Sequence, residues 1–308
     1  MTQSPTQLRF LTREAKIPKT VQLPITREEF GALRDAHKSL VHISEFETRF
    51  DQLVESHIEL KEYFYLSSIR NVSVSTFEGP MDTYNRMNKL NRLLFNTLNL
   101  GKFYLDKHFH NHQKTDETSF IYRLTSSKEL HESVRDYRDE VFHENIEYQL
   151  ACKLRGTNQH HSLPVKSLTS GYSRQPGSKN LTSVIYTSVN SEILNKIGIS
   201  SNLLQHFGES VDLHSVIDGY VYAIAKQHCH SRELLQYLQE SSLELLNKKM
   251  TDLRTKYSNI IGAFEVVDYD REQLFHLDTD WTIVMKELQK KNSRPVDYSK
   301  IEFETYKK

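Results

Sequence analysis

The stretch from residue 44 to residue 64 constrains most strongly what this chain can fold into. Large side chains recur there at alternating steps of four and three residues, namely Phe46, Phe50, Leu53, His57, Leu60 and Phe64. On an α-helix this spacing places all of them along one face. Such a face has to be covered by partner helices, so the sequence predicts a mainly α protein built as a helical bundle.

Three other segments have helical patterns. A stripe of leucines predicts a helix at about residues 81–108. Serines near residue 126 can cap another helix that we expect to run on to Leu150. A third pattern covers residues 212–257, and the sequence leaves open whether it forms one helix or two.

We expect three parts along the chain. Residues 1–40 carry scattered prolines and charges, which is typical of an extended N-terminal arm. Residues 41–260 form the helical domain, with a basic, β-containing insertion at about 151–200. Residues 261–308 begin with a strand-like run and continue into a terminal helix, so they are interpreted as a strand–helix extension.

Composition narrows the class of protein. The chain has 40 basic and 40 acidic side chains among 308 residues, so any affinity for nucleic acid has to come from local asymmetry. Its two cysteines, Cys152 and Cys229, do not make a disulfide framework and fit a reducing compartment. The N-terminus lacks an apolar core of signal-peptide length, and the chain lacks a membrane-spanning apolar run. We therefore expect a cytoplasmic protein without a membrane span.

A compact charged run lies in the helix that begins near residue 126. Arg135, Asp139 and His143 are spaced four residues apart and form one polar stripe, so Asp139 could orient both neighbours. Arg138 precedes His143 by five residues, which separates them by about 140° on a straight helix. Arginine and histidine near a carboxylate can act on a phosphodiester without a metal ion. For Arg138 and His143 to act on the same phosphodiester, either the helix has to be distorted or two copies of the chain have to meet across a twofold axis.

The residues Arg138-Asp139-x-x-x-His143 resemble the Arg-(Asn/Asp/His)-x-x-x-His motif of the HEPN superfamily of helical, dimeric proteins. Many members are metal-independent endoribonucleases of antiviral defence and toxin–antitoxin systems, and others only bind or dimerise. The resemblance implies a HEPN-like helical bundle, and the residue pattern further along the chain adds a small β-hairpin insertion to it. The resemblance further implies that His143 transfers the proton, that Arg138 binds the scissile phosphate, and that Asp139 supports their orientation.

The bare Arg-x4-His pattern is weakly specific, because it also occurs at Arg155 and Arg271. Only the match at Arg138 combines a helical context with the polar second residue. The helix around residues 90–96 also resembles the partner helix that precedes the motif in HEPN bundles. Asn91 and Asn96 on that helix, together with Arg135, are therefore candidate supporting residues. A salt-bridged, solvated helix surface is the alternative for the charged run.

The segment from residue 148 to residue 191 contains no Asp or Glu and supplies the candidate RNA-binding residues Lys153, Arg155, Lys166, Arg174 and Lys179. The alternative is a basic loop that balances acidic helices. Within the segment, residues 181–189 have the alternating pattern of a strand, which we expect to pair with residues 162–168 in a hairpin.

Metal and cofactor chemistry has little support. Histidines cluster near residues 108–112, 160–161 and 228–230, but none of these clusters has the ligand spacing of a metallohydrolase. There is no phosphate-cradling glycine loop and no Gly-x-Ser-x-Gly motif. We expect neither a metal nor a cofactor.

The resulting hypothesis is a metal-independent endoribonuclease of a defence or toxin–antitoxin system. It would cleave RNA by attack of the 2′-hydroxyl at a composite site of a homodimer, and an antitoxin or defence-system protein would be its partner. The alternatives are a non-catalytic HEPN-like protein that dimerises or binds RNA or a partner, and a plain interaction scaffold. The RNA target and the activating trigger cannot be derived from the sequence.

Overall fold

The computed structural model describes residues 5–14, 17–73, 79–109, 119–160, 165, 167–174, 181–196, 198–257 and 259–301. The fold is mainly α-helical with a small antiparallel sheet, as the sequence predicts. The chain divides into two compact units. Unit 1 comprises Met1–Thr48 and Arg232–Ser293, and unit 2 comprises Arg49–Ser231 and Arg294–Lys308.

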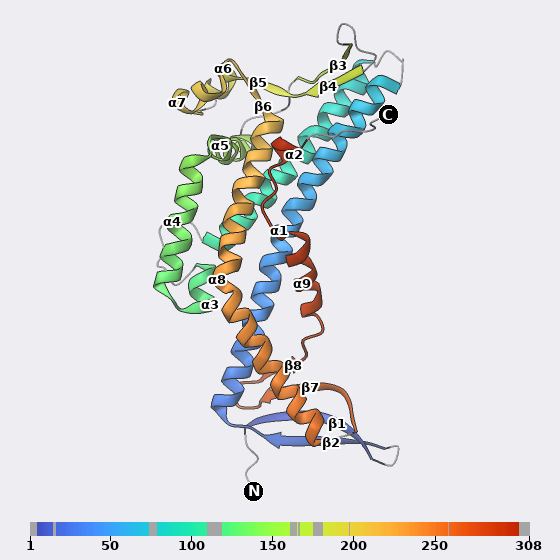
Figure 1. The fold of residues 1–308 in the computed structure, drawn as a ribbon, viewed down its shortest axis with the longest axis vertical. Coiled ribbons are helices and arrows are strands. Elements are labelled where there is room, and N and C mark those ends of the chain that lie inside the picture. Colours follow the sequence, from blue (N-terminus) through green and yellow to red (C-terminus); the bar gives the residue numbers. More distant parts are fainter. Residues whose placement is uncertain are drawn as a thin grey trace. The chain divides into compact units, whose positions relative to one another are not determined.

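Figure 1 labels the elements. The helices are α1 (Arg27–Ser73), α2 (Pro80–Phe109), α3 (Phe120–Thr125), α4 (Lys128–Glu144), α5 (Ile146–His160), α6 (Ser191–Lys196), α7 (Ser201–Leu204), α8 (Leu213–Lys256) and α9 (Thr282–Lys291). The strands are β1 (Thr6–Glu14), β2 (Ile17–Pro24), β3 (Thr169–Arg174), β4 (Leu181–Tyr186), β5 (Ser188–Asn190), β6 (Ser210–Asp212), β7 (Ile260–Asp268) and β8 (Gln273–Leu277).

The N-terminal residues belong to the sheet of unit 1. Four antiparallel strands lie in the order β2-β1-β7-β8. Leu8 and Phe10 alternate onto the buried face of β1, and the Phe10 ring packs edge-on against Tyr257 at 5.0 Å and Phe264 at 5.5 Å. The segment expected to be an extended arm is therefore a β-hairpin followed by a helix. Its strand partner β7 lies far along the chain, where local sequence patterns cannot reveal it.

The three longest helices, α1, α2 and α8, form where the apolar periodicity predicts helices, and the structure defines where each begins and ends. The side-chain oxygen of Thr26 accepts a hydrogen bond from the backbone nitrogen of Glu29 at 3.0 Å, so Thr26 caps α1, which begins at Arg27. The leucine stripe forms α2. The C-terminal pattern is resolved as one continuous helix, α8, of 44 residues.

A buried ion pair joins α1 and α8 within unit 1. Glu47 is fully buried, and its two carboxylate oxygens accept hydrogen bonds from the Nε and Nη2 atoms of Arg232 at 2.8 and 2.6 Å. Arg232 Nη1 also donates to the carbonyl oxygen of Asn292 at 2.7 Å, and Gln289 donates to Glu47 at 3.2 Å. The ion pair is bidentate, and both the guanidinium and the carboxylate have a further hydrogen-bond partner. Buried charges need such partners because they have lost their hydrogen bonds to water.

The hairpin expected in the insertion is present, but its partner strand differs from the prediction. β4 pairs antiparallel with β3, not with residues 162–168. The physical reason is visible at Val165, whose backbone N–H and carbonyl both bond the side-chain amide of Asn91 at 2.9 and 3.0 Å. A residue whose two backbone groups are already bonded cannot contribute them to a β-ladder.

Two glycines let helices of unit 2 approach closely. A Cβ atom at Gly101 of α2 would overlap the ring of Tyr220, and one at Gly219 of α8 would overlap the side chain of Glu147. Tyr220 is buried and its hydroxyl donates to the carbonyl oxygen of Leu98 at 3.3 Å. The ring therefore cannot move aside without losing a buried hydrogen bond.

We expect Gly101→Ala to lower the free energy of unfolding by about 1–3 kcal/mol, because overpacking against Tyr220 outweighs the better helix propensity of alanine. Gly31→Ala is the matched control, since nothing lies near a Cβ atom at that helical position. The control should be neutral or stabilising by up to about 1 kcal/mol. Urea denaturation followed by circular dichroism measures both, and equal effects of the two substitutions would contradict the packing argument.

Candidate functional site

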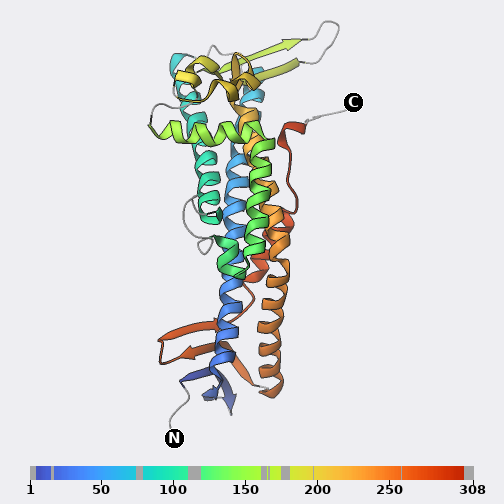
Figure 2. The same ribbon diagram turned by 90° about the vertical axis from the view of Figure 1, so that its left-hand side faces the viewer.

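The site is built on a corner between α4 and α5. The sequence predicts one helix through this region, but Asn145 adopts an extended conformation with φ −118° and ψ 102°. Its side-chain oxygen accepts a hydrogen bond from the backbone nitrogen of Tyr148 at 2.6 Å, and Gln149 donates to the carbonyl oxygen of Phe142 at 2.8 Å. Asn145 thus caps α5, and Gln149 binds the end of α4. Figure 2 shows α5 running across the end of α4.

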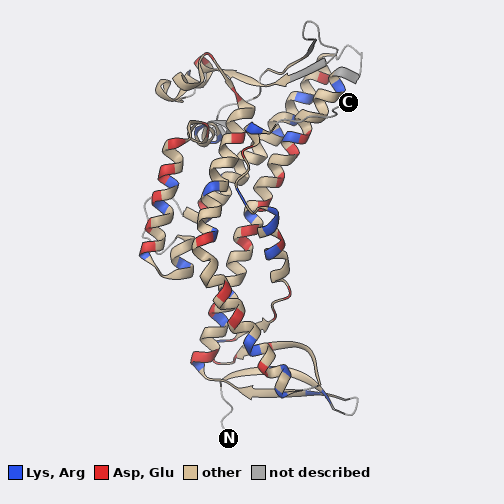
Figure 3. Ribbon diagram, viewed as in Figure 1, with Lys and Arg blue, Asp and Glu red and all other residues tan. Residues whose placement is uncertain are grey.

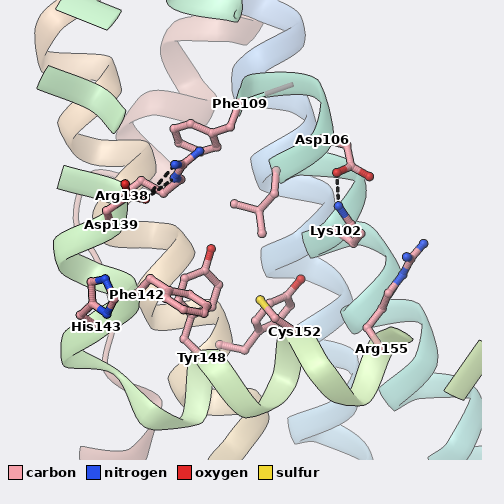
Figure 4. Close-up of a pocket in the computed structure, with 12 residues that line it drawn as sticks. Lys102, Asp106, Phe109, Arg138, Asp139, Phe142, His143, Tyr148, Cys152 and Arg155 are labelled. Atoms are coloured by element: carbon pink, nitrogen blue, oxygen red, sulfur yellow. Dashed lines mark hydrogen bonds and ion pairs between the residues drawn. The ribbon is translucent and has the colours of Figure 1, made fainter. Parts of the chain in front are cut away.

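A cavity of about 520 Å³ lies inside this corner and is lined by residues of α2, α4, α5 and α8. Its lining includes the three motif residues Arg138, Asp139 and His143, and also Arg155. In Figure 4 the side chains of the motif residues lie on one side of the pocket, and Lys102, Asp106 and Arg155 lie on the other. Arg138 and His143 both belong to the regular helix α4 and both line this cavity, without a contact between them among the described residues.

Arg138 is held in place by two contacts. Its Nε and Nη2 atoms donate to one carboxylate oxygen of Asp139 at 2.9 and 2.7 Å, and the guanidinium carbon lies 5.3 Å from the centroid of the Phe109 ring. Its side chain is 20% exposed, so the ion pair is partly shielded from water. The guanidinium is thereby oriented before any substrate arrives.

The polar stripe expected on α4 is arranged differently. Asp139 bonds Arg138, and among the contacts of the described residues it has none to Arg135 or His143. Arg135 contacts its neighbour Asp136 at 3.4 Å, is exposed and does not line the cavity. Figure 3 shows basic and acidic residues mixed along α4, so each arginine has a close acidic neighbour. A long arginine side chain can bend to reach the acidic residue next to it in the sequence, so its partner does not have to lie one helical turn away.

His143 lies in the last turn of α4 and is exposed. Its ring contacts the Phe142 ring edge-on, with 5.9 Å between the centroids. An exposed imidazole at the mouth of a cavity can exchange protons with a bound molecule, which a buried histidine cannot do as readily. His143 thus has the accessibility that proton transfer needs.

The opposite side of the cavity carries a second set of charges. Lys102 and Asp106 form an ion pair one turn apart on α2. The Nε atom of Arg155 is buried and has no hydrogen-bond partner among the described residues. Two of the three permanent cations therefore have an acidic partner in the described lining, and Arg155 does not. The guanidinium of Arg155 lines the cavity without an acidic partner in its described lining, so an anion bound there can pair with its charge.

Tyr148, Cys152 and Arg155 share one face of α5 and line the cavity, although only Arg155 is a candidate in the sequence. Burial raises the pKa of the Cys152 thiol to about 12 and also raises the pKa of the Tyr148 hydroxyl. Because of this raised pKa, Cys152 is a protonated thiol at neutral pH. The thiolate, which is the reactive form, would appear only at high pH. Their spacing of four and three residues would have revealed this face, had α5 been recognised as a separate helix.

The other candidate residues do not gather at this cavity. Asn91 is buried and holds the backbone of Val165, and Asn96 is an exposed residue of α2. Lys153 is exposed and outside the lining. The remaining basic candidates cannot be placed: Lys166, Lys179 and the side chain of Arg174 lie outside the described residues.

Within the described residues, no group of three or more His, Cys, Asp or Glu side chains is arranged to hold a metal ion. His108 is buried in the core, with its ring 4.8 Å from that of Phe120, and His110 and His112 lie outside the described residues. No helix in the described part of the chain is both long and apolar enough to cross a membrane. Comparisons with protein-family models, curated proteins and solved structures found no match for this chain.

Proposed function

We propose that this protein is a metal-independent endoribonuclease that acts at the cavity between α4 and α5. The observation that carries the proposal is that one cavity contains an oriented arginine, Arg138, and an accessible histidine, His143. The guanidinium of Arg155, which lines the same cavity without an acidic partner among the described residues, adds a positive charge for a second phosphate oxygen or a neighbouring phosphate. The HEPN resemblance leads to the same reaction and suggests a role in defence or in a toxin–antitoxin system.

In the proposed reaction, the 2′-hydroxyl oxygen of RNA attacks the adjacent phosphorus. His143 accepts the hydroxyl proton as the new oxygen–phosphorus bond forms, and it returns a proton to the 5′ oxygen as the old bond breaks. Arg138 donates hydrogen bonds to the phosphoryl oxygens, where negative charge increases in the transition state. The products are a 2′,3′-cyclic phosphate and a free 5′-hydroxyl, and no external water or metal ion takes part in this step.

The test is cleavage of an RNA oligonucleotide by the purified full-length protein in excess chelator. A matched oligonucleotide carries a single 2′-deoxy nucleotide at the cleaved position. We expect the RNA to be cut to a cyclic phosphate, as identified by mass spectrometry, and the deoxy site to stay intact because it lacks the nucleophile. Loss of cleavage in chelator, or cleavage of the deoxy site, would refute the proposed chemistry.

The guanidinium charge of Arg155, unpaired in the described lining of the cavity, also supports a second candidate function, which is RNA binding without cleavage. A protein of this kind would retain RNA in a salt-sensitive manner, and Arg155→Ala would weaken the retention. It would leave the RNA intact under all conditions in which it binds. Retention without any product therefore distinguishes this function from the nuclease.

A homodimer, and an antitoxin or other defence protein as its partner, remain proposals. The cavity of a single chain already contains both Arg138 and His143. Assembly of this pair therefore does not itself need a second copy, although a second copy can still complete the RNA-binding surface. Mixing two inactive variants, one lacking the arginine and the other the histidine, separates these possibilities.

A further inference from the structure

A second cavity of unit 2, of about 760 Å³, shares no lining residue with the first. Its apolar walls come from α1, β4 and the segment that follows α9, and they include Ile58, Phe64, Tyr65, Ile185, Tyr298 and Ile301. The polar part comes from α1, the end of β6, the start of α8 and the segment that follows α9. A cavity with aromatic and aliphatic walls and a few polar groups has the composition of a small-molecule site.

The one lysine of this lining is already engaged. The Nζ atom of Lys61 donates to a carboxylate oxygen of Asp218 at 2.6 Å and lies 3.0 Å from the Nε2 atom of His214. Because an ammonium group only donates, Nε2 has to accept, which fixes the proton of His214 on Nδ1. Burial also lowers the pKa of His214, in keeping with this neutral form. The other carboxylate oxygen of Asp218 lies 3.0 Å from the Nε2 atom of buried His57, so the charge of Asp218 is already engaged by Lys61 and by its contact with His57.

The charges that remain are negative. Glu62 is exposed and has no ion pair or hydrogen bond among the described residues. The carboxylate of Asp212 accepts one hydrogen bond, from the backbone nitrogen of His214 at 3.0 Å. The lining has three carboxylates and one lysine, so two negative charges are uncompensated. A phosphate would be repelled here, whereas the described lining of the first cavity has an arginine without an acidic partner.

We propose that this second cavity binds a small organic cation, with a protonated amine carried on an aromatic or aliphatic body. The ammonium group lies between Glu62 and Asp212, and the apolar body packs against the rings of Phe64, Tyr65 and Tyr298. Aromatic rings and carboxylates attract a cation together, since the negative face of the ring adds to the charge of the acid. This site is independent of RNA cleavage.

The test uses tryptamine and indole-3-acetate, which share one ring system and carry opposite charges. Titration of the full-length protein, followed by ligand-observed NMR and calorimetry, should show binding of tryptamine and at least tenfold weaker binding of indole-3-acetate. The double variant Glu62→Gln and Asp212→Asn should weaken tryptamine binding about tenfold. The double variant should fold normally. Asp212 caps the start of α8 through its hydrogen bond with the backbone nitrogen of His214, and asparagine caps a helix as well as aspartate does.

Glu59→Gln is the matched control, as it removes an exposed acid of the same helix that does not line the cavity. Tryptamine binding should be unchanged in this variant. The proposal is overturned if tryptamine does not bind, if indole-3-acetate binds equally well, or if the double variant binds tryptamine like the natural sequence. Weakening by Glu59→Gln to the same extent would also overturn it, since only bulk charge would then matter.

Discussion

His143→Ala is expected to slow RNA cleavage by about 10²–10⁴-fold, because the reaction loses the only imidazole in the described lining of the cavity. Arg138→Ala is expected to cost about 10²–10³-fold, the typical effect of removing one donor to a developing phosphoryl charge. Single-turnover cleavage of a labelled oligonucleotide measures both rates. Circular dichroism establishes that each variant is folded.

His131→Ala is the matched control for the histidine, because it lies on the same helix and does not line the cavity. Its rate should equal that of the natural sequence. Equal losses in His131→Ala and His143→Ala would mean that the helix, and not the imidazole of His143, is responsible. An unchanged rate in His143→Ala would remove the proposed mechanism altogether.

Mixing Arg138→Ala with His143→Ala tests whether one chain supplies the pair. A composite site across a homodimer recovers activity in mixed dimers, in which one of the two sites is intact. A site within one chain recovers none. The shared cavity favours the second result, and recovered activity would instead support the composite site expected from the sequence.

Arg232→Met is expected to lower the free energy of unfolding of unit 1 by about 3–5 kcal/mol, because it leaves the carboxylate of Glu47 buried without its bidentate partner. Gln289 alone cannot replace a charge. The measurement is urea denaturation followed by the fluorescence of Trp281, the only tryptophan of the chain. Trp281 belongs to unit 1, so its signal reports the unit that contains the ion pair.

The double variant Glu47→Leu and Arg232→Met is the control for this pair. Apolar groups of similar volume often replace a buried ion pair at little cost, so most of the lost stability should return. If the double variant were less stable than Arg232→Met alone, the two side chains would stabilise unit 1 through their packing and not through their charges. If Arg232→Met had no effect, Glu47 would have to be protonated or hydrated.

The parts of the fold that follow from local sequence were predictable. The spacing from Phe46 to Phe64 identifies the face of α1, and serines near residue 126 indicate the start of α4, where Ser127 accepts a hydrogen bond from the backbone nitrogen of Leu130 at 3.2 Å. These features depend on residues within one or two turns. The sequence therefore shows them directly.

The corner at Asn145 was not predictable, because the apolar pattern continues through it to Leu150. The turn depends on the cap that Asn145 supplies and on the close approach that Gly219 allows, which is far along the chain. The ion pair of Arg138 with its neighbour Asp139 was also missed. The spacing rule for helices favours partners one turn away, whereas the position of the guanidinium also depends on the ring of Phe109 on α2.

The division of the chain into units has a consequence for how the protein can be shortened. The chain passes between the units after Thr48, after Ser231 and after Ser293, and the first two of these points lie inside helices α1 and α8. The fragment 49–231, which would begin inside α1 and end inside α8, would expose four backbone N–H groups at its beginning and four carbonyl groups at its end. It would also lack Tyr298, which lines the second cavity. Point substitutions in the intact chain are therefore the means to test the proposed RNA cleavage and the proposed cation binding separately.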